Sequence, residues 1–153
     1  YDELCELAEK AQQIKDELMR AVDEDTEAFN EVIAGIRMPK DTPEQIALRS
    51  KVIREGYKAA ARVPFNTAQL CSEVLDLCQA AADIGNQAVM SDAGVGALMA
   101  LAGVQGAIHK VRINLPNPKD EAFIAGMEER LDELLSGSRE RCEAIQRQVE
   151  SSY

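Results

Sequence analysis

The sequence of 153 residues contains no tryptophan, and aromatic residues make up only 4% of it. Glycine and proline are also few, at 9 and 5 residues. Sandwiches and barrels depend on aromatic and β-branched strands joined by glycine- and proline-rich turns, so this composition disfavours both. The frequent alanine, leucine, isoleucine and valine instead favour packed helices. A hydrophobic share of 46% and a charged share of 29% are typical of one globular domain.

Positive charge is scarce as well. Lys and Arg number 17 against 27 Asp and Glu, which gives a formal net charge of −10. A phosphate backbone and an anionic membrane surface both repel such a chain, so we expect neither nucleic acid nor a membrane as a partner. The most apolar stretch, residues 84–108, contains Gly, Asn, Gln and Ser together with one Asp, which argues against a membrane span.

The cysteines and the single histidine form no metal-binding pattern. No C-x-x-C pair is present among the four cysteines, so we expect no metal ion. Cys71 and Cys78 lie seven residues apart on one helical face and are predicted to be buried as small apolar side chains. Thiols that stay reduced favour a cytoplasmic protein.

Proline, glycine and capping residues divide the chain into predicted helices. The sequence Thr42-Pro43-Glu44-Gln45 has the pattern of a capping box with proline at the first helical position. Pro64 is predicted to end a helix, Gly85 to end the next, and Ser91 to cap the one after. No segment alternates as a strand does. We therefore predict an all-α fold of about five long helices, over residues 2–37, 42–63, 66–84, 91–115 and 120–149.

The fourth predicted helix is apolar over most of its surface, which is typical of a central, buried helix. One of its stripes consists of small residues: Gly96, Ala100, Gly103 and Ala107. Each glycine lowers helix stability by about 1 kcal/mol. We therefore expect the glycines to allow close approach of a neighbouring helix, including one across a dimer interface, or of a ligand.

The first predicted helix has a charged residue on its apolar stripe. The apolar residues step by three and four: Leu4, Leu7, Ala11, Ile14, Leu18, Val22, Phe29, Val32 and Ile36. Between Val22 and Phe29 the same stripe passes through Asp25. Withdrawal from water disfavours a charged carboxylate, and a carboxyl group that exchanges protons near neutral pH suits general acid–base catalysis. A purely structural carboxylate, paired with a backbone amide or an arginine, is the alternative that stays open.

Two further segments are candidate binding regions. Residues 85–94 are predicted to form a loop that leads into a helix N-terminus, where free amides favour an anion or a polar ligand edge. Asp92 there can equally stabilise the helix by complementing its dipole. The segment 37–62 carries seven basic residues and three acidic ones. It is either a solvated face or a site for the anionic tail of a ligand.

Six ordered motifs resemble one family, the cyclodeaminase/cyclohydrolase family of folate enzymes. The motifs are V-D-E-D-T-E-A-F at 22–29, R-M-P-K-D-T-P-E at 37–44, V-P at 63–64, G-N at 85–86, S-D at 91–92 and I-N-L at 113–115. The resemblance covers nearly the whole chain. The family includes the C-terminal domain of formimidoyltransferase-cyclodeaminase and the methenyltetrahydrofolate cyclohydrolases.

The resemblance implies an all-helical, intertwined homodimer or higher oligomer. Its substrate is a tetrahydrofolate derivative, and no cofactor is implied. In the family the second acid of D-x-D-x-E-A-F is the catalytic one, which corresponds to Asp25. The remaining expected site residues bind substrate. The candidates for holding the pterin or the reacting nitrogens are Asn86, Ser91, Asp92 and Asn114. The candidates for holding the glutamyl tail are Arg37 and Lys40, or the basic face of the second helix.

Family members begin with a proline- and glycine-rich turn and an additional alanine-rich helix. We therefore interpret residues 1–153 as a single domain of this type that lacks the N-terminal helix. The expected activity is that of a cyclodeaminase, a lyase that converts 5-formiminotetrahydrofolate to 5,10-methenyltetrahydrofolate and ammonia. Hydrolysis of 5,10-methenyltetrahydrofolate to 10-formyltetrahydrofolate is the first alternative. A non-catalytic helical scaffold is the second, since acidic, alanine-rich helices would show the same patterning.

Overall fold

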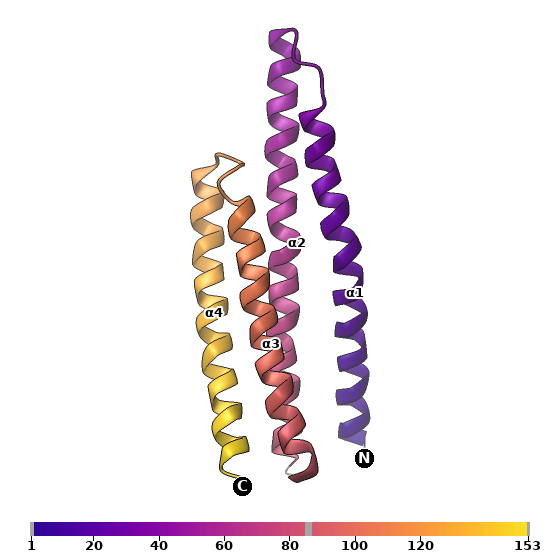
Figure 1. The fold of residues 1–153 in the computed structure, drawn as a ribbon, viewed down its shortest axis with the longest axis vertical. Helices are drawn as coiled ribbons and strands as arrows, with labels where there is room; N and C mark the ends of the chain where they lie inside the picture. The colour runs from indigo at the N-terminus through magenta and orange to yellow at the C-terminus, as the bar shows by residue number, and fades with distance from the viewer. Residues whose placement is uncertain (1, 85–86, 153) are drawn as a thin grey trace.

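A computed structural model of the protein describes residues 2–84 and 87–152. These residues form the helices α1 (Asp2–Ile36), α2 (Pro43–Asp83), α3 (Gln87–Asn114) and α4 (Glu121–Glu150), without a strand. The helices alternate in direction, and the α1–α2 hairpin extends beyond the α3–α4 hairpin at one end, while both chain ends lie at the other (Figure 1). The predicted all-α fold class is therefore confirmed.

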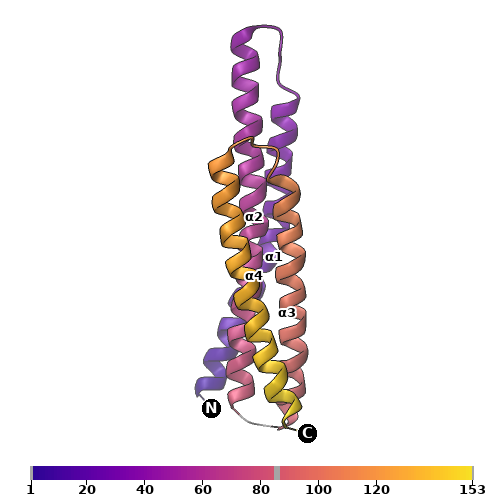
Figure 2. The same ribbon diagram turned by 90° about the vertical axis from the view of Figure 1, so that its left-hand side faces the viewer.

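The central helix is α2, and not the predicted fourth segment. α2 packs against α1, α3 and α4, and α1 and α4 lie on opposite sides of it (Figure 2). α1 packs on α2 but not on α3, so one apolar face of α3 stays open, with Val95, Leu98 and Met99 exposed. Among the helices described, α3 alone is long and apolar enough to cross a membrane, over Ala88–Asn114, and 33% of its most apolar window is buried.

The five-helix prediction is wrong at Pro64, because α2 continues through this residue. A proline inside a helix has no N–H for the carbonyl four residues earlier and costs about 3 kcal/mol. Here that carbonyl belongs to Ala60, and it accepts a hydrogen bond of 3.0 Å from the side-chain nitrogen of Asn114. Ala61 and Phe65, on either side of the proline, are buried in the core. Packing against α3 and α4 therefore holds the helix together across Pro64.

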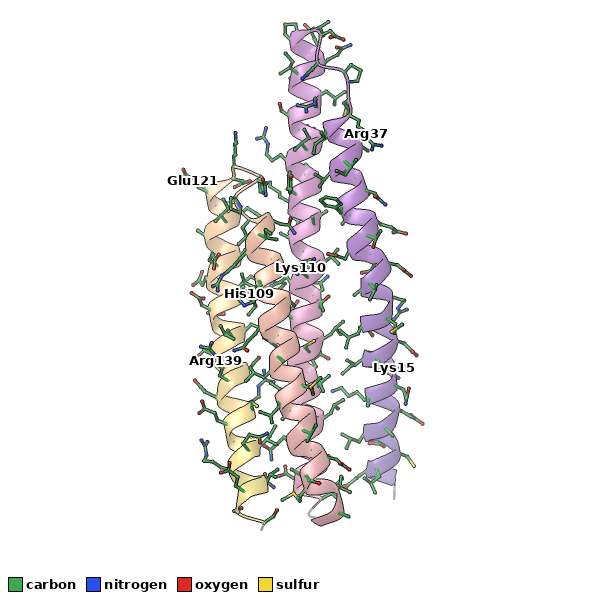
Figure 3. The ribbon with its side chains drawn as sticks, viewed as in Figure 1. Lys15, Arg37, His109, Lys110, Glu121 and Arg139 are labelled. Carbon is green, nitrogen blue, oxygen red and sulfur yellow. The ribbon has the colours of Figure 1, made fainter. Side chains whose placement is uncertain are left out.

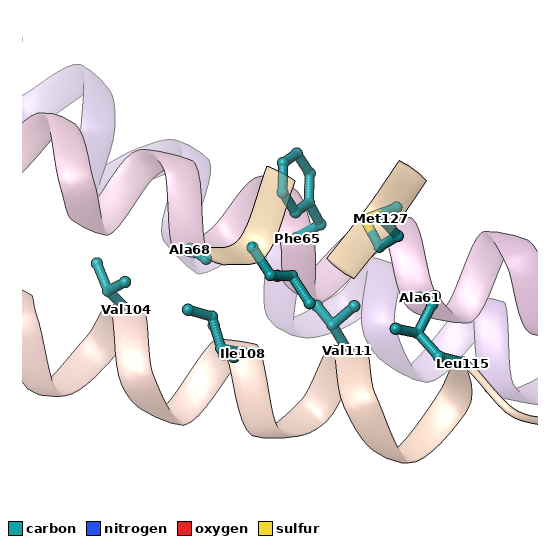
Figure 4. Packing of buried hydrophobic residues seen from close by; sticks show 10 residues of the cluster. Ala61, Phe65, Ala68, Val104, Ile108, Val111, Leu115 and Met127 are labelled. Atoms are coloured by element: carbon teal, nitrogen blue, oxygen red, sulfur yellow. The ribbon is translucent and has the colours of Figure 1, made fainter. Parts of the chain in front are cut away.

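The main core lies between α2, α3 and α4 (Figure 4). Phe65 of α2 packs with Val104 and Ile108 of α3 and with Met127 and Leu131 of α4. Complete burial of a large apolar side chain stabilises a fold by about 1.5–3 kcal/mol. This core fixes the position of α3 against α2. It therefore also determines where the polar residues at the end of α3 meet the middle of α2.

Of the N-terminal caps predicted from the sequence, the one at Thr42 is confirmed. Thr42 and Gln45 form the expected capping box. At the start of α4, the Asp120 carboxylate accepts from the Phe123 amide at 3.0 Å, a cap that was not predicted. The prediction for Ser91 is wrong, because α3 begins at Gln87 and contains it. Burial of Met90 and Ala93 against the end of α2 stabilises the extra helical turn, so most of the predicted loop at 85–94 is helical.

Two glycines of α3 allow the close helix approach that the sequence predicts. A Cβ atom at Gly103 would lie 2.7 Å from the Cys71 sulfur, and one at Gly96 would lie 3.0 Å from the Cys78 sulfur. Burial raises the pKa of both thiols. All four cysteines are free. Cys78 is buried as predicted, whereas Cys71, also predicted to be buried, is only half-buried.

Candidate active site

A cavity of about 530 Å³ lies between α1, α2 and the end of α3. This volume is within the range of small-molecule sites, roughly 300–1,000 Å³. Its lining residues are Asp25, Thr26, Phe29, Asn30, Tyr57, Ala60, Lys110, Ile113, Asn114 and Asn117. Two of the predicted site residues, Asp25 and Asn114, are therefore brought together from helices that are far apart in the sequence.

Asp25 is half-buried, which corrects the expectation that it lies on a fully buried stripe. Its stripe neighbours Val22 and Phe29 are 63% and 54% exposed. The face of α1 that is buried against α2 is narrower and passes through Ala28 and Val32. Asp25 lies at the edge of that face, so its carboxyl group is partly shielded by protein and still reaches the cavity.

The cavity combines aromatic rings with side-chain amides. Phe29 and Tyr57 supply two rings, from α1 and α2, and three asparagines supply donors and acceptors. Flat aromatic faces pack well on a planar heterocycle, while amides pair with its polar edge. The sequence predicts Phe29 only as part of an apolar stripe, and it assigns no role to Tyr57, Asn30 or Asn117. These residues become recognisable only when three helices are assembled.

Lys110 is the positive charge of the cavity lining. It forms no ion pair with Asp25 or with any other residue that the structure describes, so both side chains remain available to a ligand. Figure 3 shows Lys110 about halfway up the molecule on α3, next to the exposed His109. One sequence signal pointed to it: the small-residue stripe of this helix turns polar at Lys110 and Asn114, one turn apart.

A second cavity of about 410 Å³ adjoins the first and shares Asn117 with it. Arg54 and Lys119 line this second cavity, and neither forms an ion pair with a residue that the structure describes. Lys119 has a φ of 52°, the left-handed conformation, at the turn between α3 and α4. Two unpaired cations beside the first cavity are suited to an anionic extension of its ligand.

Two further basic residues of α2, Lys58 and Arg62, have structural partners. Lys58 contacts Asp120 at 2.8 Å and Glu55 at 3.3 Å. The hydrogen bond that Lys58 donates to Asp120 raises the pKa of Lys58 and lowers that of Asp120. Lys58 and Arg62 also lie 5.6 and 5.4 Å from the centre of the Phe123 ring, within cation–π range. These two cations therefore join α2 to α4.

Arg37 and Lys40 are exposed and do not line the Asp25 cavity. Arg37 lies near the protruding end of the α1–α2 hairpin, well above the level of Lys110 (Figure 3). Within one chain they are therefore separated from the cavity that holds the carboxyl group.

Ser91 and Asp92 lie near the opposite end of α3 from Asn114. At about 1.5 Å per residue, Asp92 is roughly 33 Å from Asn114 along the helix, so within one chain they do not share a small ligand. Asp92 instead lines an apolar groove of about 570 Å³ between α1, α2 and α3. Asn86 lies outside the described residues. The described residues contain no group of three or more His, Cys, Asp or Glu side chains that could hold a metal ion.

A family model described as formiminotransferase-cyclodeaminase matches residues 1–133. The chain belongs to this family. It is 39% identical over 132 residues to a methenyltetrahydrofolate cyclohydrolase of Methylorubrum extorquens, covering 86% of the chain and 62% of that protein. It is 33% identical over 134 residues to a formimidoyltransferase-cyclodeaminase of Sus scrofa, covering 88% of the chain and 25% of that protein. The chain thus spans less than two thirds of either relative.

A solved structure agrees with the family in its fold. The formiminotetrahydrofolate cyclodeaminase of Thermotoga maritima superposes with a TM-score of 0.67 at 21% sequence identity, covering 92% of the chain and 64% of that structure. The formiminotransferase-cyclodeaminase family that the six motifs indicated is therefore confirmed. Its named members here process tetrahydrofolate derivatives by two different reactions.

Proposed function

We propose that the protein acts on tetrahydrofolate that carries a one-carbon unit at N5 and N10. The observation that carries the proposal is the cavity in which one half-buried carboxyl group, Asp25, meets two aromatic rings and three amides. Phe29 and Tyr57 would pack on the faces of the pterin, and the asparagines would pair with its edge. No cofactor is needed, because acid–base groups suffice for the chemistry.

The glutamyl tail of the substrate would extend into the adjoining cavity. We assign it to Arg54 and Lys119, because these cations have no ion-pair partner among the described residues and their cavity shares Asn117 with that of Asp25. Arg37 and Lys40, the residues proposed from the sequence, line neither cavity.

The reaction we favour is hydrolysis of 5,10-methenyltetrahydrofolate to 10-formyltetrahydrofolate. Water attacks the bridging carbon while the Asp25 carboxylate accepts a proton from it. The bond from that carbon to N5 then breaks as N5 takes this proton back from Asp25. The hydroxyl group of the adduct loses its own proton to solvent, which leaves the formyl group on N10. We rank this reaction first because the 39% identity to a cyclohydrolase exceeds the 33% identity to the bifunctional enzyme.

Cyclodeamination is the second candidate, supported by the relatives named formimidoyltransferase-cyclodeaminase. There N10 attacks the formimino carbon of 5-formiminotetrahydrofolate and loses its proton. Ammonia leaves from the tetrahedral adduct after protonation, and the methenyl bridge forms. Asp25 would serve as the acid for ammonia and as the base for N10.

The deciding experiment compares Asp25→Asn with Asp23→Asn, an exposed acid on the same helix that lies outside the cavity. Loss of methenyl absorbance measures hydrolysis, and ammonia release from the formimino compound measures cyclodeamination. We expect Asp25→Asn to lower one of these rates by about 10²–10⁴-fold, with an unchanged circular dichroism spectrum, and Asp23→Asn to leave it unchanged. If the wild-type protein is inactive in both assays, or the two variants behave alike, the proposal is wrong and a scaffold role is favoured. A scaffold would gain stability from Asp25→Leu.

We also propose that the protein works as a homodimer or a higher homo-oligomer in the cytoplasm. Large apolar residues outside the Asp25 cavity remain exposed on α1 and on α3: Met19, Val22, Val95, Leu98 and Met99. A second copy that covers this surface would explain why α3 is apolar enough for a membrane span in an acidic chain. Light scattering across a dilution series should give at least twice the mass of 16.8 kDa, in the absence of detergent.

A further inference from the structure

Asn114 is held in place by a backbone carbonyl of α2 that lacks its usual helical donor. Pro64 has no N–H, so the Ala60 carbonyl lacks the usual helical donor four residues later. The Asn114 side-chain nitrogen donates to this carbonyl at 3.0 Å and to the Lys110 carbonyl at 3.2 Å. The proline of one helix and the asparagine of the next are thus joined through a single backbone oxygen.

These two contacts determine which way the amide of Asn114 faces. Both partners are carbonyl oxygens, so only the nitrogen of the amide can meet them, and a flipped amide would place its oxygen against two other acceptors. Both N–H groups are therefore engaged. The oxygen of Asn114 forms no hydrogen bond with a residue that the structure describes, and it is the polar atom that this side chain can offer to a ligand in the cavity.

We propose that Pro64 is a positioning residue for ligand recognition, which it achieves by fixing Asn114 as a hydrogen-bond acceptor in the cavity. An N–H of the ligand, on its heterocycle or at its reacting nitrogen, is the group that such an acceptor selects. The proposal rests on the function proposed above for its ligand. Its geometry, however, concerns only Pro64, Ala60 and Asn114, and can be tested without a ligand.

The substitution Pro64→Ala restores the missing N–H. The helix then supplies its own donor to Ala60, which competes with Asn114 and frees the amide to rotate. We expect kcat/KM to fall about tenfold, mainly through a higher KM, because one ligand hydrogen bond is lost. The melting temperature should stay equal or rise, since an uninterrupted helix is more stable than one with an internal proline. A purely structural role for Pro64 predicts instead that stability and activity fall together.

A double-mutant cycle shows whether Pro64 acts through Asn114. Asn114→Ala alone should lower kcat/KM at least as much as Pro64→Ala, and the double variant should be no worse than Asn114→Ala. Additive losses, or full activity in Pro64→Ala, would overturn the proposal. The matched control is Pro43→Ala, since this proline occupies the first turn of the same helix, where an N–H has no helical partner. If the buried site does not tolerate alanine, Pro64→Gly restores the same N–H without a side chain.

Nuclear magnetic resonance supplies a readout that is independent of activity. The side-chain NH₂ signals of Asn114, assigned by their absence in Asn114→Ala, should show slow exchange with water in the wild-type protein. They should move and exchange faster in Pro64→Ala and stay in place in Pro43→Ala. If they do not respond to Pro64→Ala, the positioning proposal is wrong. If they respond as expected while no folate is turned over, the geometry stands and the proposed function is wrong.

Discussion

The contact between Gly103 and Cys71 leads to a quantitative prediction about helix packing. Replacing any exposed or semi-exposed helical glycine by alanine stabilises the helix by about 0.8–1.0 kcal/mol. At Gly103 this gain meets a cost, because the new Cβ would lie 2.7 Å from the Cys71 sulfur and 3.4 Å from its Cβ. Overpacking of this kind costs about 1–3 kcal/mol, so Gly103→Ala should be destabilising by up to about 2 kcal/mol.

Gly106 provides the matched control on the same helix, one turn further along. A Cβ there meets nothing within 4 Å, so Gly106→Ala should show the gain in helix stability alone. Comparing the two variants cancels the helix term and leaves the contact with Cys71. The expected difference of about 1–3 kcal/mol corresponds to a melting temperature about 2–12 °C lower for Gly103→Ala. Adding Cys71→Ala to Gly103→Ala should recover most of the lost stability, because this substitution removes the sulfur that the new Cβ contacts.

Thermal and urea unfolding, followed by circular dichroism, measure these differences. All variants are compared at one protein concentration, because association between copies would make the melting temperature depend on concentration. The reasoning is refuted if Gly103→Ala is as stable as Gly106→Ala. It is equally refuted if Cys71→Ala lowers the stability of Gly103→Ala further, because the sulfur would then not be the obstacle.

Two predictions concern the turn between α3 and α4. Asp120→Asn keeps the helix cap but removes the charge that pairs with Lys58, so it should be less stable than wild type at pH 7. The pairing with Lys58 lowers the pKa of Asp120 below its ordinary 3.8. The stability difference between wild type and Asp120→Asn should therefore be present above pH 3.8 and disappear as the pH falls through the lowered pKa. Equal stability of the two proteins at pH 7 in urea titrations would contradict this. Lys119→Gly relieves a left-handed backbone, so it should raise stability by up to about 1 kcal/mol while increasing KM for polyglutamylated folate more than for the monoglutamate. An equal effect on the two substrates would remove Lys119 from the tail site.

A local sequence signal identified one helix end that depends on local chemistry. The capping box at Thr42 involves groups only three residues apart, and it was predicted. The cap at Asp120 is equally local but was not assigned from the sequence. Continuation of α2 through Pro64 was not predictable, because the compensating donor is Asn114, fifty residues later in the sequence. The start of α3 was missed for a similar reason, since burial of Met90 against α2 outweighs the capping signal of Ser91.

The candidate site was predictable only in part. Asp25 was identified because it interrupts an apolar period, and this signal survives although the residue is only half-buried. Periodicity does not show which apolar residues the chain itself covers, so Val22 was expected in the core and is exposed. Tyr57 had no local signal of function, and the only signal at Lys110 was the polar end of a small-residue stripe. They become site residues through the packing of three helices around one cavity.

The two hairpins divide the proposed work between them. Asp25, the proposed proton-transfer group, lies on the α1–α2 hairpin, whereas Lys110 and Asn114 lie on the α3–α4 hairpin. Substitutions on α3 can therefore alter how the ligand is held without changing the proposed proton-transfer group. Such a separation lets the polar contacts of the ligand vary while the acid–base group stays the same. It offers a physical route by which one scaffold can serve relatives that add water and relatives that expel ammonia.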